Sequence, residues 1–482
     1  MSASSALALA ACSGGDEGGD AGPPVTQEYQ RLVEDARYEM QQGNLVESGK
    51  LFDEALAIDR ENPGIWVDIA RLRFRGGEHV GAFEAADFAL ELDPRHAPAL
   101  LMRAQLVRDA YGLEPSLTWF ESGLALHPEN TDLLGEYAGT LGDLGRSEEM
   151  LLAVRNLAEI DPRDPRVHYL QSVLAVRGND PVLASSLLKR SKMRDDGVPS
   201  AIVVDALGEI QQGNYDNAAN SLEGLLQRQP GNVRVMELLA RAMWLNGRDR
   251  EIVDRFGARA RAADASPYLI MLVGRSYERL GQRAAAVPLI ERAYAGRSGE
   301  LTPLGSVRNL PEQTRAVREM IAAGNAGATR DYANELTRRF EGSGDILALA
   351  GDAALARGET SNALNLYSRA AQIRRPWPLT RKIIHAYRAA SDIDAADTLL
   401  IRHLRSEPSN TEAILMYAQQ SARDEDWLRA EVLLDNAIAR GAGNDPSVLE
   451  LRIDAARALG KDGDAGAFAA TLAQVRPEPF LD

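Results

Sequence analysis

A period of 34 residues runs from Ala36 to Ile290 and constrains this chain more than any other feature of its sequence. One series at this step is made of small residues: Ala36, Ala70, Ala104, Ala138, Ser172, Ala206, Ala240 and Gly274. A second series is mostly glycine: Gly43, Gly77, Tyr111, Gly145, Asn179, Gly213, Gly247 and Gly281. A third is apolar and mostly bulky: Phe52, Ala86, Phe120, Val154, Leu188, Leu222, Phe256 and Ile290. Three series in step indicate stacked copies of one supersecondary unit.

Each series has a physical role in a unit made of two antiparallel helices. The small residue lets the first helix approach the second, and the glycine ends the first helix in a left-handed cap. The bulky residue fills the space between one unit and the next. Runs of β-branched residues with period-two alternation are missing from the sequence. We therefore expect an all-α fold without a β-sheet.

The period breaks after Ala293, where the next unit is displaced by about eight residues. Small residues then recur at Ala328, Ala363, Ala396 and Ala430, and bulky residues at Tyr332, Tyr367, Leu400, Leu434 and Phe468. We expect about eight units before the break and about five after it, the last being a degenerate cap. The break is either a tolerated loop insertion or a bend that separates two binding surfaces, and the insertion is the favoured interpretation.

Segments 55–59, 89–94 and 124–128 read ALAID, ALELDP and LALHP. They resemble the second helix of a tetratricopeptide repeat (TPR) and the exit from it. The resemblance extends over roughly residues 29–477. It implies a right-handed superhelical solenoid of antiparallel helix pairs, with about 13 TPR units. The resemblance is specific for the fold and weak for function, because TPR arrays serve many processes.

The N-terminus predicts a lipoprotein signal. Residues 3–11 are small and apolar, and the run 9–12 (LAAC) resembles the lipobox of bacterial lipoproteins. Cys12 is the only cysteine, and the resemblance implies that it is lipidated, with Ser13 behind it favouring the outer membrane. No Lys or Arg precedes Cys12, as one normally would in a signal. Either the true start lies upstream, or the segment is a frayed alanine-rich terminus.

These observations predict a division along the chain. We assign 1–12 to the lipoprotein signal and lipidation site, and 13–28 to a flexible Gly/Asp-rich tether. Residues 29–297 form an N-terminal TPR array, 298–308 an irregular connection, and 309–482 a C-terminal TPR array.

The net charge of −16 argues against a nucleic-acid partner, because phosphate binding needs a dense basic face. None of the six histidines falls in a metal-binding motif such as H-E-x-x-H. The chain carries no nucleophile elbow and no P-loop. We therefore predict no enzyme activity, no catalytic residue, no metal and no cofactor.

In TPR arrays the first helices of successive units line a concave groove in which ligands dock, and the resemblance implies such a groove here. The residues that it places on this face are Arg37, Arg71, Phe74, Arg108, Tyr169, Val173, Leu207, Ile210, Arg241, Trp244, Arg275, Arg381 and Arg388. An apolar stretch flanked by arginines in an acidic protein suggests an anionic or acidic amphipathic ligand. The alternative is that the arginines form a solvated helix face and the apolar residues pack internally.

The leading hypothesis is a non-catalytic scaffold for protein–protein interactions, lipid-anchored at the periplasmic face of the outer membrane. Such a protein would assist envelope assembly, exopolysaccharide export or secretion. Its partners would be proteins of that machine and also an anionic polysaccharide, with membrane contact through the lipid alone. The alternative is a soluble TPR adaptor, cytoplasmic or periplasmic, that binds an extended acidic or amphipathic peptide in the groove.

Overall fold

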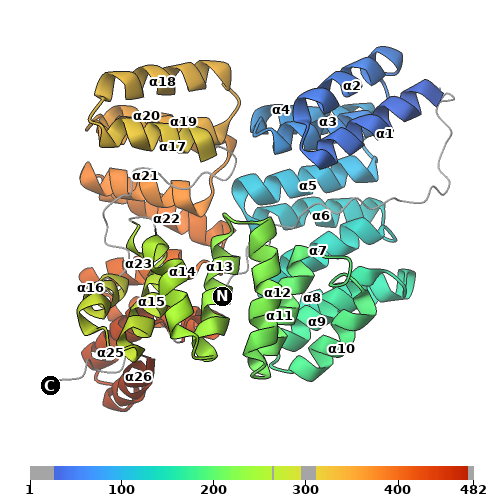
Figure 1. Ribbon diagram of the computed structural model, residues 1–482. Coiled ribbons are helices and arrows are strands. Elements are labelled where there is room, and N and C mark those ends of the chain that lie inside the picture. The colour runs from blue at the N-terminus through green and yellow to red at the C-terminus, as the bar shows by residue number, and fades with distance from the viewer. Residues whose placement is uncertain (1–26, 263–264, 295–310, 444, 476–482) are drawn as a thin grey trace. The chain divides into compact units, whose positions relative to one another are not determined.

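The computed structural model describes residues 27–262, 265–294, 311–443 and 445–475 (Figure 1). Its helices alternate between a first helix of each pair, here called an A helix, and a second, here called a B helix. The A helices are α1 (Gln27–Gln42), α3 (Pro63–Arg75), α5 (Ala97–Tyr111), α7 (Thr131–Asp143), α9 (Pro165–Arg177), α11 (Pro199–Gln211), α13 (Val233–Leu245), α15 (Pro267–Arg279), α17 (Pro311–Ala322), α19 (Gly344–Ala356), α21 (Trp377–Ala389), α23 (Thr411–Arg423) and α25 (Pro446–Ala458). The B helices are α2 (Leu45–Ile58), α4 (His79–Leu92), α6 (Leu113–Leu126), α8 (Ser147–Ile160), α10 (Pro181–Ser191), α12 (Tyr215–Arg228), α14 (Asp249–Arg261), α16 (Arg283–Tyr294), α18 (Ala326–Arg339), α20 (Thr360–Ile373), α22 (Ile393–Ser406), α24 (Trp427–Ala437) and α26 (Asp462–Val475).

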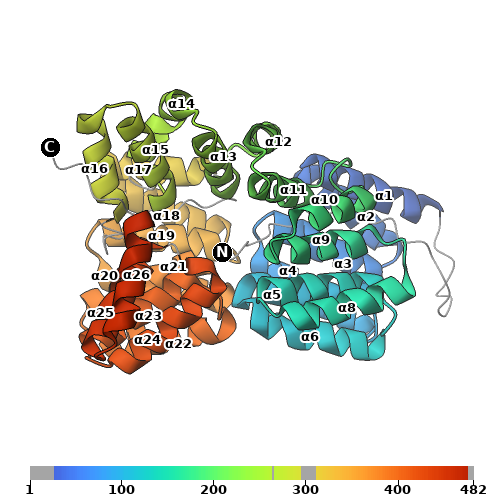
Figure 2. The ribbon, with the colours of Figure 1, turned by 90° about the horizontal axis from the view of Figure 1, so that it is seen from below.

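The all-α prediction is confirmed, since no strand occurs within the described ranges. A and B helices pack as pairs, as α3 does with α4, and many B helices also contact the next A helix, as α12 does with α13. At the C-terminal side α26 packs against α25 (Figure 2). A short π-helical turn, η1 (Ile438–Ala442), extends α24. The described part of the chain therefore contains 13 helix pairs, as predicted.

The small-residue series lies where the sequence places it, inside the A helices. Ala36, Ala70, Ala104, Ala138, Ser172, Ala206 and Ala240 are all fully buried. At Gly274, a Cβ atom would come within 2.8 Å of Cγ1 of Ile290, so this pair of helices is closer than alanine allows. The first series therefore marks the contact between the two helices of a unit.

The glycine series ends the A helices with a left-handed residue, as expected. Gly43, Gly77, Gly145, Gly213, Gly247 and Gly281 have φ between 71° and 86°, a region that glycine enters without a Cβ penalty. Asn179 takes the same conformation at φ 58°. The exception is Tyr111, which is the last residue of α5, and there Gly112 adopts the positive φ of 110°. A one-residue extension of α5 moves the cap along the chain.

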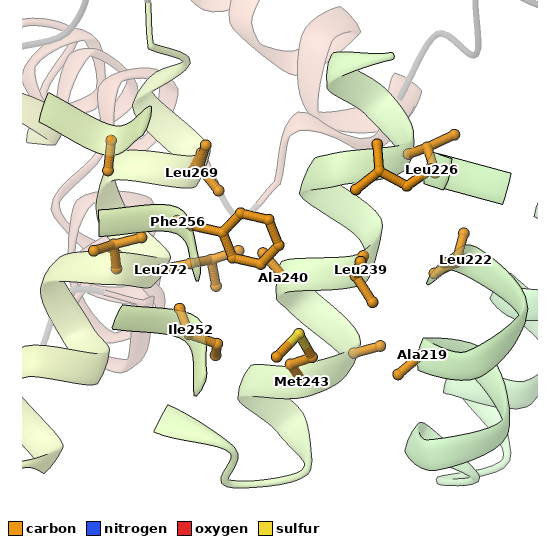
Figure 3. Close-up of a cluster of buried hydrophobic side chains, with 14 of the residues drawn as sticks. Ala219, Leu222, Leu226, Leu239, Ala240, Met243, Ile252, Phe256, Leu269 and Leu272 are labelled. Carbon is orange, nitrogen blue, oxygen red and sulfur yellow. The ribbon is translucent and has the colours of Figure 1, made fainter. Parts of the chain in front are cut away.

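The bulky series fills the space around the B helices. Phe52, Phe120, Leu188 and Leu222 are buried to 2% exposure or less. Figure 3 shows one stretch of this core, in which Leu222, Leu239, Met243, Phe256 and Leu269 come together from α12, α13, α14 and α15. Each repeat therefore buries its apolar side chains by stacking on the next repeat.

Beyond the break the predicted register is right in three B helices and wrong in α18. Ala363, Ala396 and Ala430 are fully buried at the fourth position of α20, α22 and α24. In α18 the buried residues are Thr329, Ala333 and Leu336, and the first two lie one residue later than the predicted Ala328 and Tyr332. Helix α18 begins at Ala326, so its fourth and eighth residues are 329 and 333.

Contacts in space divide the chain into two compact units. Unit I holds the described residues between 141 and 302 and between 400 and 482, and unit II holds those between 11 and 140 and between 303 and 399. The predicted division along the chain, with arrays at 29–297 and 309–482, remains a prediction. The predicted connection 298–308 lies outside the described residues.

Candidate binding face of the A helices

The predicted ligand residues all lie on A helices, but they fall into two groups. Arg37, Arg71, Phe74, Arg108, Arg381 and Arg388 belong to unit II, and Tyr169, Val173, Leu207, Ile210, Arg241, Trp244 and Arg275 belong to unit I. Within each unit, several neighbouring A helices touch, as α3 does with α5 and α9 with α11. Side chains on these touching A helices therefore share a face.

The polar part of this face, on α1 and α3, is built around a buried carboxylate. Asp68 is 1% exposed and accepts hydrogen bonds from Nε of Arg37 at 2.8 Å and from Nη1 of Arg71 at 2.9 Å. The Arg37 side chain remains 50% exposed, whereas that of Arg71 is 30% exposed. Two guanidinium groups sharing one carboxylate leave a net charge of +1 at this point.

Arg108 is also neutralised, and its position is less accessible than the sequence suggests. Its side chain is 20% exposed and pairs with Glu136 on α7 at 2.8 Å. Nη1 of Arg108 also donates to Thr140 at 2.9 Å. The net charge of Arg37, Arg71 and Arg108 with their partners Asp68 and Glu136 is +1, because three positive charges meet two negative ones. The positive potential here is therefore much weaker than three aligned arginines imply.

Phe74 belongs to the hydrophobic core of unit II. It packs against the buried cluster of α1–α5, and its ring meets the His79 ring edge-on with centroids 6.1 Å apart. On α21, Arg388 pairs with Asp397 at 3.6 Å, and Arg381 is partly buried with interactions of its own. These three side chains are engaged within the protein.

In unit I the face is apolar over α9 and α11. Tyr169, Val173 and Leu207 are partly buried against the cluster of Ala175, Val176, Ala184, Leu188, Ala201 and Val204, and Ile210 is buried. Burial raises the pKa of the Tyr169 hydroxyl, which therefore stays neutral. The three partly buried side chains combine internal packing with a remaining exposed edge, which is the arrangement expected of a face that binds apolar groups.

Helices α13 and α15 continue this face with an aromatic–arginine stack. The guanidinium of Arg279 lies 3.7 Å from the centroid of the Trp244 ring, and its Nη1 donates to the Trp244 carbonyl oxygen at 2.9 Å. Arg275 is only 9% exposed and pairs with Glu278 at 2.6 Å, so it acts inside the fold. Arg241 is partly exposed and lies near Tyr268. Trp244 and Arg241 are therefore the members of this group best placed to meet a ligand.

The sequence analysis did not identify the carboxylates that neutralise the arginines of this face, or the side chains that link neighbouring A helices. Asp68 and Glu136 occupy different places in the repeat, so the 34-residue period did not reveal them. The last residues of A helices donate to carbonyl oxygens near the end of the preceding A helix, from Arg75 to Met40 at 2.7 Å and from Gln211 to Val176 at 2.9 Å. These donors do follow the period, and a search for Arg or Gln at this step could have found them.

Metal chemistry and membrane insertion find no support in the described residues. No group of three His, Cys, Asp or Glu residues there could hold a metal ion. None of the helices that the structure describes is long and apolar enough to span a bilayer. The predicted lipidation site, Cys12, lies outside the described residues.

Comparison with known proteins relates the chain to helical-repeat proteins. Residues 209–251 match the family model described as tetratricopeptide repeat. Cellulose synthase operon protein C of Xanthomonas axonopodis pv. citri (strain 306) is 27% identical in an alignment of 246 residues that covers 45% of this chain and 16% of that protein. The chain thus matches only a small part of this relative's length.

Two solved structures are similar in outline. A tetratricopeptide repeat protein from Parabacteroides merdae ATCC 43184 is 17% identical with a TM-score of 0.34, covering 60% of this chain and 100% of that one. Yeast Tom70 is 13% identical with a TM-score of 0.30, covering 94% of this chain and 98% of that one. These similarities are too low to carry an argument. The 34-residue period, the helix pairs built on it and the matched repeat together identify the chain as a tetratricopeptide repeat protein.

Proposed function

We propose that the chain is a non-catalytic interaction scaffold of the bacterial envelope, anchored by a lipid on Cys12 at the periplasmic face of the outer membrane. In this role it assists exopolysaccharide export or a related assembly or secretion system. The observation that carries this proposal is the match over 246 residues to a protein named for a cellulose synthase operon. The lipobox-like run ending at Cys12 supports the location.

The faces described above support the scaffold role. The A helices of unit I offer the partly exposed apolar side chains of Tyr169, Val173 and Leu207, and those of unit II offer the half-exposed Arg37. Such surfaces suit a partner that binds along several repeats, because each A helix adds one or two contacts. The alternative is an adaptor without an anchor that binds an extended acidic or amphipathic peptide along the same faces.

The anchor is tested by fractionation of cells that express the gene from its native start. Wild-type protein is expected in the outer-membrane fraction with a mass that includes acyl chains, because multiple chains give stable anchoring. Cys12→Ala should leave the membrane fraction uncleaved, with unchanged helix content. Ser13→Ala is the matched control and should still carry the lipid. Wild-type protein recovered without acyl chains and with Met1 intact would support the adaptor instead.

The charged face is tested with Arg37→Gln. Arg71 continues to pair with Asp68 in this variant, so the buried carboxylate keeps a partner. Binding of an oligouronate or a Glu-rich amphipathic peptide should weaken by about 1 kcal/mol, roughly fivefold in Kd, and should also weaken with salt. Arg31→Gln, an exposed position on the same helix α1, is the control and should bind like wild type. Equal, salt-independent binding by all three proteins would show that Arg37 is only part of a solvated helix face.

A further inference from the structure

Unit II contains two segments that are far apart in the sequence, and they meet at helix ends. Three hydrogen bonds to backbone carbonyl oxygens join them: the Arg375 amide donates to the Ala110 carbonyl at 2.7 Å, the Val80 amide to the Gly342 carbonyl at 3.3 Å, and the Tyr111 hydroxyl to the Gln372 carbonyl at 3.3 Å. All three lie within unit II. The segment holding α3–α5 thus docks its helix ends on the loops around α19–α21.

One side chain, Arg374, carries the charge at this junction. Its Nη2 donates to Asp109 of the first segment at 2.9 Å, and its Nη1 donates to Asp345 of its own segment at 2.9 Å. The Arg374 side chain is 18% exposed, so both bonds are largely withdrawn from water. A guanidinium held between two carboxylates is well suited to bridge two surfaces, because its donors are fixed in one plane.

His79, the first residue of α4, lies beside this bridge and is 3% exposed. Burial lowers the pKa of His79, and the nearby positive charge of Arg374 lowers it further, while Asp345 and Asp109 act in the opposite direction. The ring packs edge-on against Phe74. The junction therefore accommodates a neutral imidazole.

Apolar packing holds each segment together by itself. The cluster around Phe52 and Ile65 draws its residues from positions 29–106, and the cluster around Tyr367 and Leu379 draws its residues from 347–399. The junction described above is made of hydrogen bonds and ion pairs. An ion pair withdrawn from water contributes little net free energy, because the cost of desolvating its charges offsets much of their attraction. Separating the two segments should therefore cost much less than unfolding either one.

We propose that the Asp109–Arg374–Asp345 bridge is a clasp that holds the two segments of unit II together and opens while their helix pairs stay folded. Opening would expose Arg374 and His79 without disturbing either apolar cluster. The clasp is a conformational device of this fold, and it does not depend on the proposed envelope role.

The test measures the distance between spin labels on the full chain, placed at Val46→Cys on α2 and Glu335→Cys on α18, both exposed, in a Cys12→Ser background. Asp109→Lys should lengthen and broaden this distance, because it places a positive charge against Arg374. Adding Arg374→Glu and Asp345→Asn to Asp109→Lys should restore the original distance, because the reversed pair attracts and no second carboxylate faces the new one. Asp87→Lys is the matched control, since Asp87 pairs with Arg103 inside the first segment at 2.6 Å and should leave the distance unchanged.

Circular dichroism reports on the helices in the same samples. If Asp109→Lys loses helix content, Asp109→Asn replaces it, and its label distance should broaden as salt is raised. Normal helix content with an unchanged narrow distance in the variant would overturn the clasp. A long distance in the variant that combines Asp109→Lys, Arg374→Glu and Asp345→Asn would also overturn it, because a clasp made of opposite charges must tolerate their exchange.

Discussion

Replacing Lys382 with methionine is expected to lower the free energy of unfolding by about 3–5 kcal/mol, because it leaves a buried charge without its partner. Lys382 on α21 is 7% exposed, and its Nζ pairs with Asp352 on α19, which is fully buried. Tyr367 on α20 donates its hydroxyl to the same carboxylate at 2.7 Å. Burial and the Asp352 charge raise the pKa of Tyr367, so it remains a neutral donor and cannot replace the lysine.

Chemical denaturation followed by circular dichroism measures this loss. Lys50→Met is the control, because the Lys50–Glu47 pair is exposed to solvent and its loss should hardly change the stability. Adding Asp352→Asn to Lys382→Met should recover much of the lost stability, because a neutral amide needs no opposite charge and its oxygen still accepts the hydrogen bond from the Tyr367 hydroxyl. A loss at Lys382 no larger than that at Lys50 would contradict a buried pair.

Replacing Ala104 with leucine should destabilise the chain by about 1–3 kcal/mol, because overpacked residues force their neighbours to move. Ala104 lies in α5, fully buried beside Phe120 and Leu133. Ala57→Leu is the matched control on an exposed face of α2, where substitutions usually change stability by less than about 0.5 kcal/mol. Thermal unfolding of the two variants gives the comparison, and equal melting temperatures would mean that Ala104 is not a contact between helices.

The fold was predictable because the period reports on backbone and packing requirements that every unit shares. A buried small residue such as Ala138 and a left-handed cap such as Gly145 recur wherever two helices must meet and the chain must reverse. The prediction was wrong where a helix changed its start or length, at α18 and at Tyr111, because a shift of one residue leaves the composition almost unchanged. Asp352 and Lys382 lie 30 residues apart, and no local pattern links them.

The candidate face was less predictable than the fold. The 34-residue step correctly placed Arg37 and Arg71 on successive A helices, but it says nothing about which carboxylates lie between them. Asp68, one helical turn before Arg71, could have been suspected from the i,i+3 spacing alone. The pairing of Arg108 with Glu136 depends on how α5 and α7 pack, which a single sequence does not specify.

The bonds from the end of one A helix to the end of the preceding one give the array a direction. The acceptor is always the earlier helix, as when Arg279 donates to the carbonyl of Trp244 or Arg75 to that of Met40. Deleting repeats from the C-terminal side therefore removes the side-chain donor from these carbonyl groups, which keep only a cap amide, as Trp244 keeps that of Gly247. Deleting repeats from the N-terminal side leaves an arginine that water solvates readily. Shortened versions of this protein should thus fray more from a C-terminal cut than from an N-terminal cut of the same length.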